Sequence, residues 1–297
     1  MIPRDRKQLL LNPFQSWHCF MLSLGLLPGL VYLPIWLWSI ARRMYMGSSS
    51  VVLNLCFIAL GFYLIFEQRN KLKTFKADAE DRFVGYALVI GTVTMHSFLF
   101  SAPSLQAITS ATSLIGVSLS VFGNRFVRKY TLAISMIVLG LLPKYLELGY
   151  SIGKIILPHD VLEKLMALVS GSILQLIGQP AIIHGKIIQV GNGAVNIADG
   201  CSGYSMAVIL AGVGFIVGIF YKLKPMKTFW LMLTGVVIAL TINVPRILLL
   251  TYSVIYWGDA SFKFWHDGWG SQIVAGIMLT VFYYVSMAIC KKTSVTA

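Results

Sequence analysis

The sequence has 297 residues, of which 57% are hydrophobic and only 12% are charged, and its net charge at pH 7 is +13. Soluble domains usually carry about 25% charged residues, so this composition excludes a water-soluble domain and indicates a chain dissolved in lipid. The basic residues form short clusters between apolar runs and not one basic face. This is how topology signals are distributed in membrane proteins, and it argues against nucleic-acid binding.

Apolar segments long enough to cross a bilayer follow one another along most of the chain. A helix needs about 20 apolar residues to span the hydrocarbon core. In chain order, the predicted spans are residues 17–40, 51–66, 84–101, 105–122, 131–150, 202–221, 228–257 and 271–290. We therefore expect an all-α integral membrane protein, a bundle of about eight transmembrane helices. Residues 1–297 should form a single membrane domain, with five spans over 17–150 and three over 202–290.

Residues 161–178 look at first like a ninth span. Their apolar residues recur at helical spacing, but Glu163, Lys164, Ser170 and Gln175 fall on the other side of the helix. A helix of this length with a polar stripe is typical of one that lies in the membrane interface.

The distribution of basic residues decides between these topologies. If the N-terminus is cytoplasmic and residues 161–178 do not span, 16 of the 24 basic residues lie on the inner side. They are Arg4, Arg6, Lys7, Arg69, Lys71, Lys73, Lys76, Arg82, Arg125, Arg128, Lys129, Lys222, Lys224, Lys227, Lys291 and Lys292. The positive-inside rule thus favours eight spans in the cytoplasmic (inner) membrane, with both termini in the cytoplasm. Arg42 and Arg43 are exceptions to it.

One long external segment, residues 151–201, follows from this topology. It holds the interfacial helix and then short β-rich runs, which are separated by His184-Gly185 and by residues 191–193. Such punctuation predicts a small β-hairpin. A hairpin alone is marginal in water, so we expect it to rest on the outer surface of the bundle, where it leads to residues 199–203.

Cys201 lies between Gly200 and Ser202-Gly203, at the outer start of the sixth span. A helix N-terminus offers free N–H groups and a partial positive charge, which favour a thiolate and could hold an oxyanion. The alternative interpretation is a small residue packed beside a glycine turn.

Arg246 lies inside the seventh span, where an arginine is costly and is by default a functional candidate. From Thr228 at the inner face, about 18 residues at 1.5 Å each place it near the outer boundary, at the depth of Cys201. Asn243 lies one turn earlier on the same face, and Pro245 loosens the backbone between them. The alternative is an arginine that snorkels to outer headgroups.

His266 belongs to a predicted external loop before the last span. A neutral imidazole can accept the proton of a thiol, and histidine is the usual partner of a cysteine nucleophile. His159 and His184 are also external and compete for this role. The topology places Cys201, Arg246 and His266 at one membrane level.

Three short segments in this order carry a resemblance: Ala-Asp-Gly-Cys-Ser-Gly at 198–203, Asn-Val-Pro-Arg at 243–246 and His-Asp-Gly-Trp-Gly at 266–270. Over residues 174–290 the sequence resembles the exosortase/archaeosortase family of multi-pass membrane cysteine enzymes. The resemblance implies a catalytic triad of Cys201, Arg246 and His266. Where many relatives follow Cys-Ser-Gly with an aliphatic residue and an arginine, this chain has Tyr204-Ser205.

The resemblance also implies the reaction and its partners. Such enzymes act on membrane-anchored proteins with a C-terminal sorting signal, which is a short motif such as Pro-Glu-Pro, a transmembrane helix and a basic tail. We expect cleavage and transfer at the outer face of the membrane, with Asn243, Asp199 and Asp267 as candidate supporting residues. An activated thiol suffices for this chemistry, so we expect neither a metal nor an organic cofactor.

A different class of function stays open at this point. A non-enzymatic envelope transporter, or a polysaccharide or lipid assembly protein, could use Arg246 to bind an anion, with Cys201 incidental. The sequence does not give the oligomeric state. Gly214-x-x-x-Gly218 in the sixth span permits close helix contact between copies or within one chain.

Overall fold

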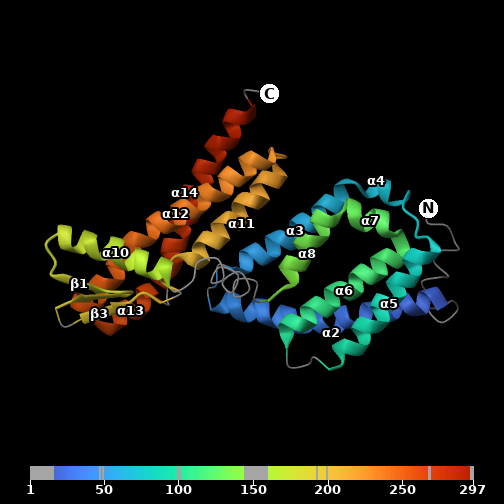
Figure 1. The fold of residues 1–297 in the computed structure, drawn as a ribbon, viewed down its shortest axis with the longest axis horizontal. Helices are drawn as coiled ribbons and strands as arrows, with labels where there is room; N and C mark the ends of the chain where they lie inside the picture. The colour runs from blue at the N-terminus through green and yellow to red at the C-terminus, as the bar shows by residue number, and fades with distance from the viewer. Residues whose placement is uncertain are drawn as a thin grey trace. The chain divides into compact units, whose positions relative to one another are not determined.

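The computed structural model describes residues 17–46, 48, 50–98, 102–143, 160–191, 193–198, 200–266 and 269–294, mostly as helices with one small sheet (Figure 1). Internal contacts divide the chain into two compact units. The N-terminal unit is Met1–Met46 with Asn54–Lys144, and the C-terminal unit is Gly47–Leu53 with Tyr145–Ala297. The single membrane domain stays a prediction.

The N-terminal unit is built from helices alone in its described part. They are α2 (Trp17–Tyr45), α3 (Ser50–Glu67), α4 (Arg69–Leu72), α5 (Ala79–His96), α6 (Pro103–Phe122), α7 (Asn124–Lys129) and α8 (Thr131–Leu141). Helices α2, α5 and α6 pack side by side (Figure 1). Helices α5 and α6 approach closely at Gly85, which has no side chain. A Cβ on Gly85 would lie only 2.6 Å from the carbonyl oxygen of Gly116.

Side-chain donors hold the end of α8, where carbonyl groups lack intrahelical partners. The buried Asn54 on α3 donates from Nδ2 to the carbonyl oxygens of Gly140 and Leu142, at 2.9 and 3.0 Å. The hydroxyl of Tyr32 donates to the carbonyl of Leu141 at 2.7 Å. Three consecutive carbonyls are therefore satisfied away from water.

Arg43, an exception to the positive-inside pattern, joins this network. Its Nη1 donates to Oδ1 of Asn54 at 3.3 Å, and its Nε donates to the carbonyl of Ser39 at 3.4 Å. The residue thus has a local structural partner that a count of topology signals does not reveal.

The C-terminal unit combines helices with a sheet. Its elements are α10 (Val161–Leu176), β1 (Ala181–His184), β2 (Ile187–Val190), β3 (Gly193–Asn196), α11 (Tyr204–Phe220), α12 (Pro225–Tyr252), the π-helix η1 (Ser253–Trp257), α13 (Gly258–His266) and α14 (Trp269–Ser294). The predicted hairpin is part of a three-stranded antiparallel sheet in the order β1-β2-β3. Gly185 and Gly191 take positive φ values of 61° and 57°, and they provide the two turns.

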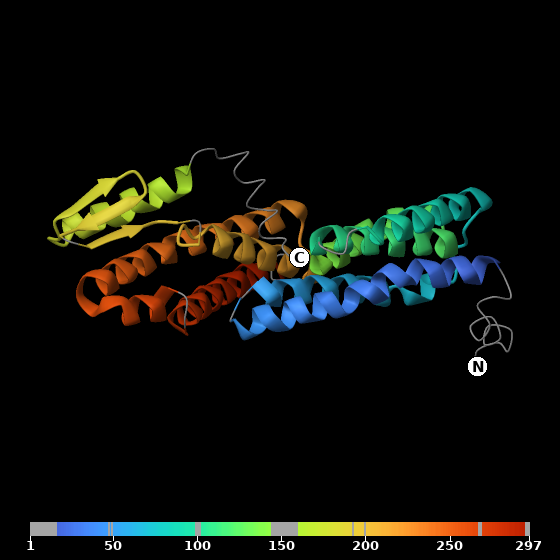
Figure 2. The same cartoon turned by 90° about the horizontal axis from the view of Figure 1, so that it is seen from below.

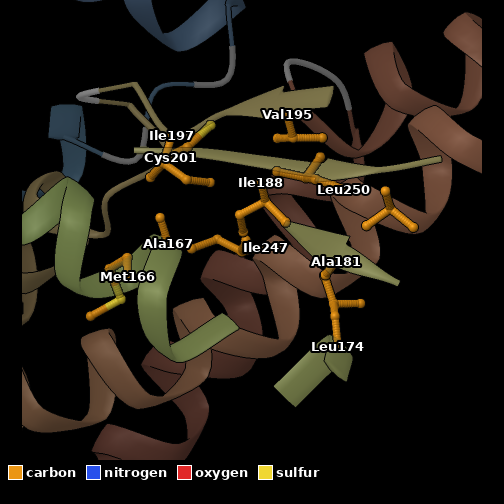
Figure 3. Close-up of a cluster of buried hydrophobic side chains, with 11 residues drawn as sticks. Met166, Ala167, Leu174, Ala181, Ile188, Val195, Ile197, Cys201, Ile247 and Leu250 are labelled. Carbon is orange, nitrogen blue, oxygen red and sulfur yellow. The ribbon is translucent and has the colours of Figure 1, made fainter. Parts of the chain in front are cut away.

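One face of this sheet packs on α10, as Figure 2 shows. The register aligns Ile183, Ile188 and Val195 across the three strands, so they share a face. Ile188 and Val195 enter a buried cluster that also includes Ile247 of α12 and Cys201 (Figure 3). The cysteine is therefore anchored in the core of the C-terminal unit.

The buried side of α10 is mixed. It combines the polar Glu163 and Ser170 and the small Ala167 and Gly171 with the large apolar Met166 and Leu174, whereas further large apolar residues point outward. The exposed ones are Val161, Leu165, Leu168, Val169 and Leu176. Small buried residues let the sheet approach closely, and an exposed apolar face is compatible with contact to lipid.

Helices α11 and α12 run side by side, and the glycine motif lies in their contact (Figure 1). A Cβ on Gly214 would lie 3.1 Å from the carbonyl oxygen of Leu231, and a Cβ on Gly218 would meet the side chain of Thr228. Packing within the chain therefore accounts for Gly214-x-x-x-Gly218.

The all-α membrane fold is confirmed. Five helical segments in the described part are long and apolar enough to cross a bilayer: α2, α3, α6, the segment Pro225–His266 made of α12, η1 and α13, and Trp269–Lys291. Two shorter apolar helices are Thr131–Leu141 and Tyr204–Phe220. The predicted third span falls on α5, whose first turn holds Glu80 and Asp81. The prediction of about eight spans stays a prediction.

Replacing Asn54 by leucine should lower the free energy of unfolding by about 1–3 kcal/mol, because buried carbonyls at the end of α8 lose their donor. Thermal unfolding of the purified protein in detergent measures the change. The control is Thr94→Val, since this exposed hydroxyl bonds only to the carbonyl of Ile90 in its own helix. Equal unfolding temperatures for Asn54→Leu and the unmodified protein would contradict the role of the network.

Candidate active site

Cys201 lies in a turn between the sheet and α11, and the backbone of this turn is fixed by hydrogen bonds. The N–H groups of Cys201 and Ser202 both donate to the carbonyl of Ala198, at 2.8 and 3.1 Å. Gly203 follows with φ at +83°, in the left-handed region, and α11 begins at the next residue. A Cβ at Gly203 would lie 3.0 Å from the side chain of Asn243, so the position needs a glycine for both backbone and space.

Helix α12 holds this turn from the other side. Nδ2 of Asn243 donates to the carbonyl of Cys201 at 2.7 Å, and this asparagine is fully buried. One helical turn later, Nη1 of Arg246 donates to the carbonyl of Gly200 at 3.4 Å. Two side chains on one face of α12 therefore bind two consecutive carbonyls that flank the cysteine.

His266 completes the cluster. Its Nε2 lies 3.1 Å from Sγ of Cys201, within hydrogen-bonding distance, with the direction set by the protonation states of the two groups. The imidazole stacks on the ring of Phe262, with centroids 5.0 Å apart and planes 21° apart. Residues at positions i and i+4 of a helix are neighbours, so α13 itself supplies this support.

The chain reaches His266 through helical structure, and the predicted loop at this position was wrong. Beyond α12 the π-helix η1 is followed by Gly258, with φ at +78°, and then by α13, which ends at His266. Helix α13 contacts η1, α12 and α14. The charged and aromatic residues that suggested a loop form a short helix, which packs beside the helix that precedes it.

A small cavity of about 120 Å³ lies beside the cluster. Its lining combines the polar groups of Arg246 and His266 with backbone at Gly200 and Gly203. The remaining lining residues are Ser205 and Met206 of α11 and Ser271, Val274, Ala275 and Met278 of α14. A largely apolar hollow with a few convergent polar groups is the usual form of a site for a small segment of substrate.

The thiol itself is covered. The Cys201 residue is 3% exposed and packs in the core, where Figure 3 places it beside Ile197. His266 therefore contacts the buried sulfur and also lines the cavity. An imidazole in this position can move a proton between the thiol and a group in the cavity.

Two buried polar atoms at the site have no hydrogen-bond partner among the described residues. They are Oδ1 of Asn243 and Nε of Arg246. Buried polar groups in native proteins are nearly always paired, so the Nε of Arg246, which lines the cavity, offers hydrogen-bonding capacity for a ligand.

The structure brings Cys201, Arg246, His266 and Asn243 together, whereas Asp199 and Asp267 lie outside the described residues. Among the competing histidines, His184 is exposed at the end of β1 and His159 lies outside the described residues. The sequence analysis missed Phe262. Its spacing of four residues from His266 would have identified it if a helix had been expected there.

The comparisons with known proteins identify one family. The sequence model of the transmembrane exosortases matches residues 48–283 of the chain, which include Cys201, Arg246 and His266. No curated protein and no solved structure matches the chain.

Replacing His266 by alanine should slow the reaction of Cys201 with methyl methanethiosulfonate at pH 7 by about tenfold or more, because the thiol loses its base. Mass spectrometry of the Cys201 peptide gives the rate, and His184→Ala is the control. A merely steric role for His266 makes the opposite prediction, since removal of the imidazole opens a path to the covered sulfur. Faster labelling in His266→Ala would therefore contradict activation.

Proposed function

The chain belongs to the transmembrane exosortase family, and we propose that it is a membrane cysteine peptidase and transpeptidase that cleaves and transfers proteins with a C-terminal sorting signal. The observation that carries the proposal is the 3.1 Å separation between Sγ of Cys201 and Nε2 of His266. A nucleophile within hydrogen-bonding distance of a base, with the base oriented by a third group, is the arrangement that covalent catalysis requires.

In the proposed reaction, Nε2 of His266 accepts the thiol proton and Sγ of Cys201 attacks the carbonyl carbon of the scissile peptide bond. The tetrahedral intermediate collapses as the C–N bond breaks, and the imidazolium gives its proton to the departing amine. The product is a thioester between Cys201 and the N-terminal part of the substrate. An incoming amine, or water, then attacks this thioester and releases the thiol.

Arg246 is the proposed stabiliser of the oxyanion. It lines the cavity, and its Nε has no partner among the described residues. One preorganised donor to an oxyanion contributes roughly 10²–10³ in rate. Asn243 acts through Cys201, since its bond to the carbonyl of Cys201 fixes the backbone that carries the sulfur. Asp199 and Asp267, next to this turn and to His266 in the sequence, stay candidate supporting residues.

The substrate proposal follows from chemistry and topology together. The lining by Met206, Val274, Ala275 and Met278 favours an apolar peptide segment, and the site belongs to a chain of membrane helices. The bias of basic residues supports an inner-membrane protein with both termini in the cytoplasm and the site at the outer face. A membrane-anchored protein cut next to its transmembrane helix fits these constraints.

Replacing Cys201 by alanine or by serine should abolish processing, because neither side chain provides a thiolate. The measurement is the size, on an immunoblot, of a tagged protein from the same cell that ends in a short motif, a transmembrane helix and a basic tail. Cys290→Ala is the matched control, since this buried cysteine lies on α14 outside the cavity lining. Continued processing by both Cys201 variants would rule out the covalent mechanism.

Replacing Arg246 by glutamine should lower the processing rate roughly 10²–10³-fold, because the oxyanion loses a charged donor. Arg246→Lys keeps the charge but loses the planar fork of donors, so we expect only partial recovery. The control is Lys263→Gln, an exposed charge on α13. An anion-binding assembly protein would instead tolerate Cys201→Ala and fail only with Arg246→Gln.

A further inference from the structure

A second hollow, of about 570 Å³, lies in the N-terminal unit, at the end that the charge distribution predicts to be cytoplasmic. We call it the basic pocket and define it by Lys76, Arg125, Arg128, Asp78 and Asp81, which line it. The segment between α4 and α5 forms one wall, and α7 forms the other. It is separate from the site at Cys201 and plays no part in the proposed reaction.

The walls of the basic pocket are tied to each other. Oδ2 of Asp81, at the start of α5, accepts a hydrogen bond from the backbone N–H of Asn124, at the start of α7, at 3.0 Å. Gly123, with φ at +80°, makes the sharp turn between α6 and α7. The rings of Phe75 and Phe126 meet edge to face with centroids 5.8 Å apart. The pocket therefore has a defined frame.

Its positive charges are not neutralised from within. Lys76, Arg125 and Arg128 form no ion pair with any residue in the described part of the chain. Three cations and two carboxylates, those of Asp78 and Asp81, line this hollow, so the cations are in excess by one. An excess of positive charge in one hollow favours an anion.

An apolar groove of about 280 Å³ adjoins the basic pocket. It runs between α3, α6 and α8, and its lining includes Phe62, Ile65, Phe126 and Ile134. The ring of Phe126 lines the groove, and the ring of Phe75, its partner, lines the basic pocket. One pair of aromatic rings thus separates a cationic hollow from an apolar one, which is the pairing of environments that a phospholipid requires.

We propose that the basic pocket binds the phosphodiester of an anionic phospholipid of the cytoplasmic leaflet, with an acyl chain along the adjoining groove. The phosphate contacts Lys76, Arg125 and Arg128, and a hydroxyl of a glycerol headgroup donates to Asp78. Basic pockets between transmembrane helices on the cytoplasmic side suit such headgroups. The apolar groove favours a lipid over free phosphate, because inorganic phosphate has no apolar part that could occupy the groove.

The test is native mass spectrometry of the full-length protein in detergent, titrated with phosphatidylglycerol. The unmodified protein should retain one tightly bound lipid, and Arg125→Gln/Arg128→Gln should weaken that binding about tenfold or more. The control is Lys71→Gln/Lys73→Gln, which removes two exposed charges from the same region outside the pocket lining. Lys76→Gln is a second pocket variant, for use if the double arginine variant does not fold.

Each outcome decides the proposal. Selective loss of lipid in the pocket variants supports it. Equal loss in Lys71→Gln/Lys73→Gln indicates diffuse attraction by the whole basic end and overturns it, as does undiminished binding in the pocket variants. Displacement of the lipid by 10 mM inorganic phosphate, at constant ionic strength, would identify a soluble-phosphate site and also overturn it.

Discussion

The geometry of the site depends on two hydrogen bonds from α12 to the turn that carries the thiol. Asn243 and Arg246, one helical turn apart, donate to the carbonyls of Cys201 and Gly200. Backbone groups away from water must be paired within the protein, so the buried bond from Asn243 stabilises an irregular turn between the sheet and α11, and the exposed bond from Arg246 adds to it. His266 ends the same continuous helical segment, Pro225–His266. The candidate base and both anchors therefore come from one segment, and only the nucleophile comes from elsewhere.

Burial of the thiol makes its reactivity dependent on this segment. Cys201 is 3% exposed and lies in an apolar cluster, and apolar surroundings disfavour a thiolate. In the proposed mechanism the imidazole of His266 offsets this cost, and its stack on Phe262 limits the orientations it can take. Arg246 and His266 line the cavity, and His266 lies within hydrogen-bonding distance of the covered sulfur.

Sequence reasoning identified the candidate site residues because helix length fixes depth in a bilayer, and depth brought Cys201, Arg246 and His266 to one level. It could not give distances, and it missed local structure where short-range signals are weak. The two glycine separators divide residues 181–198 into three β-rich runs, but the third, Gly193–Asn196, has only two apolar residues, and a hairpin was predicted in place of a three-stranded sheet. The segment before His266 was predicted to be a loop. The apolar pattern of the seventh span ends at Gly258, and charged residues follow it.

The exposed apolar residues of α10 are compatible with lipid as its solvent. In water the apolar face of a helix turns inward, but in lipid the apolar face gains nothing by burial, and close packing and hydrogen bonds decide the contacts. Ser110 and Ser113 of α6 show the same rule, since both are buried and donate to carbonyls of α2, those of Pro28 and Gly25. Burial of a polar residue is therefore a weak sign of function in this chain. Buried polar atoms that no described residue satisfies also occur away from the site, as on Gln106 and His96, so what distinguishes the Nε of Arg246 is its place on a residue that lines the cavity.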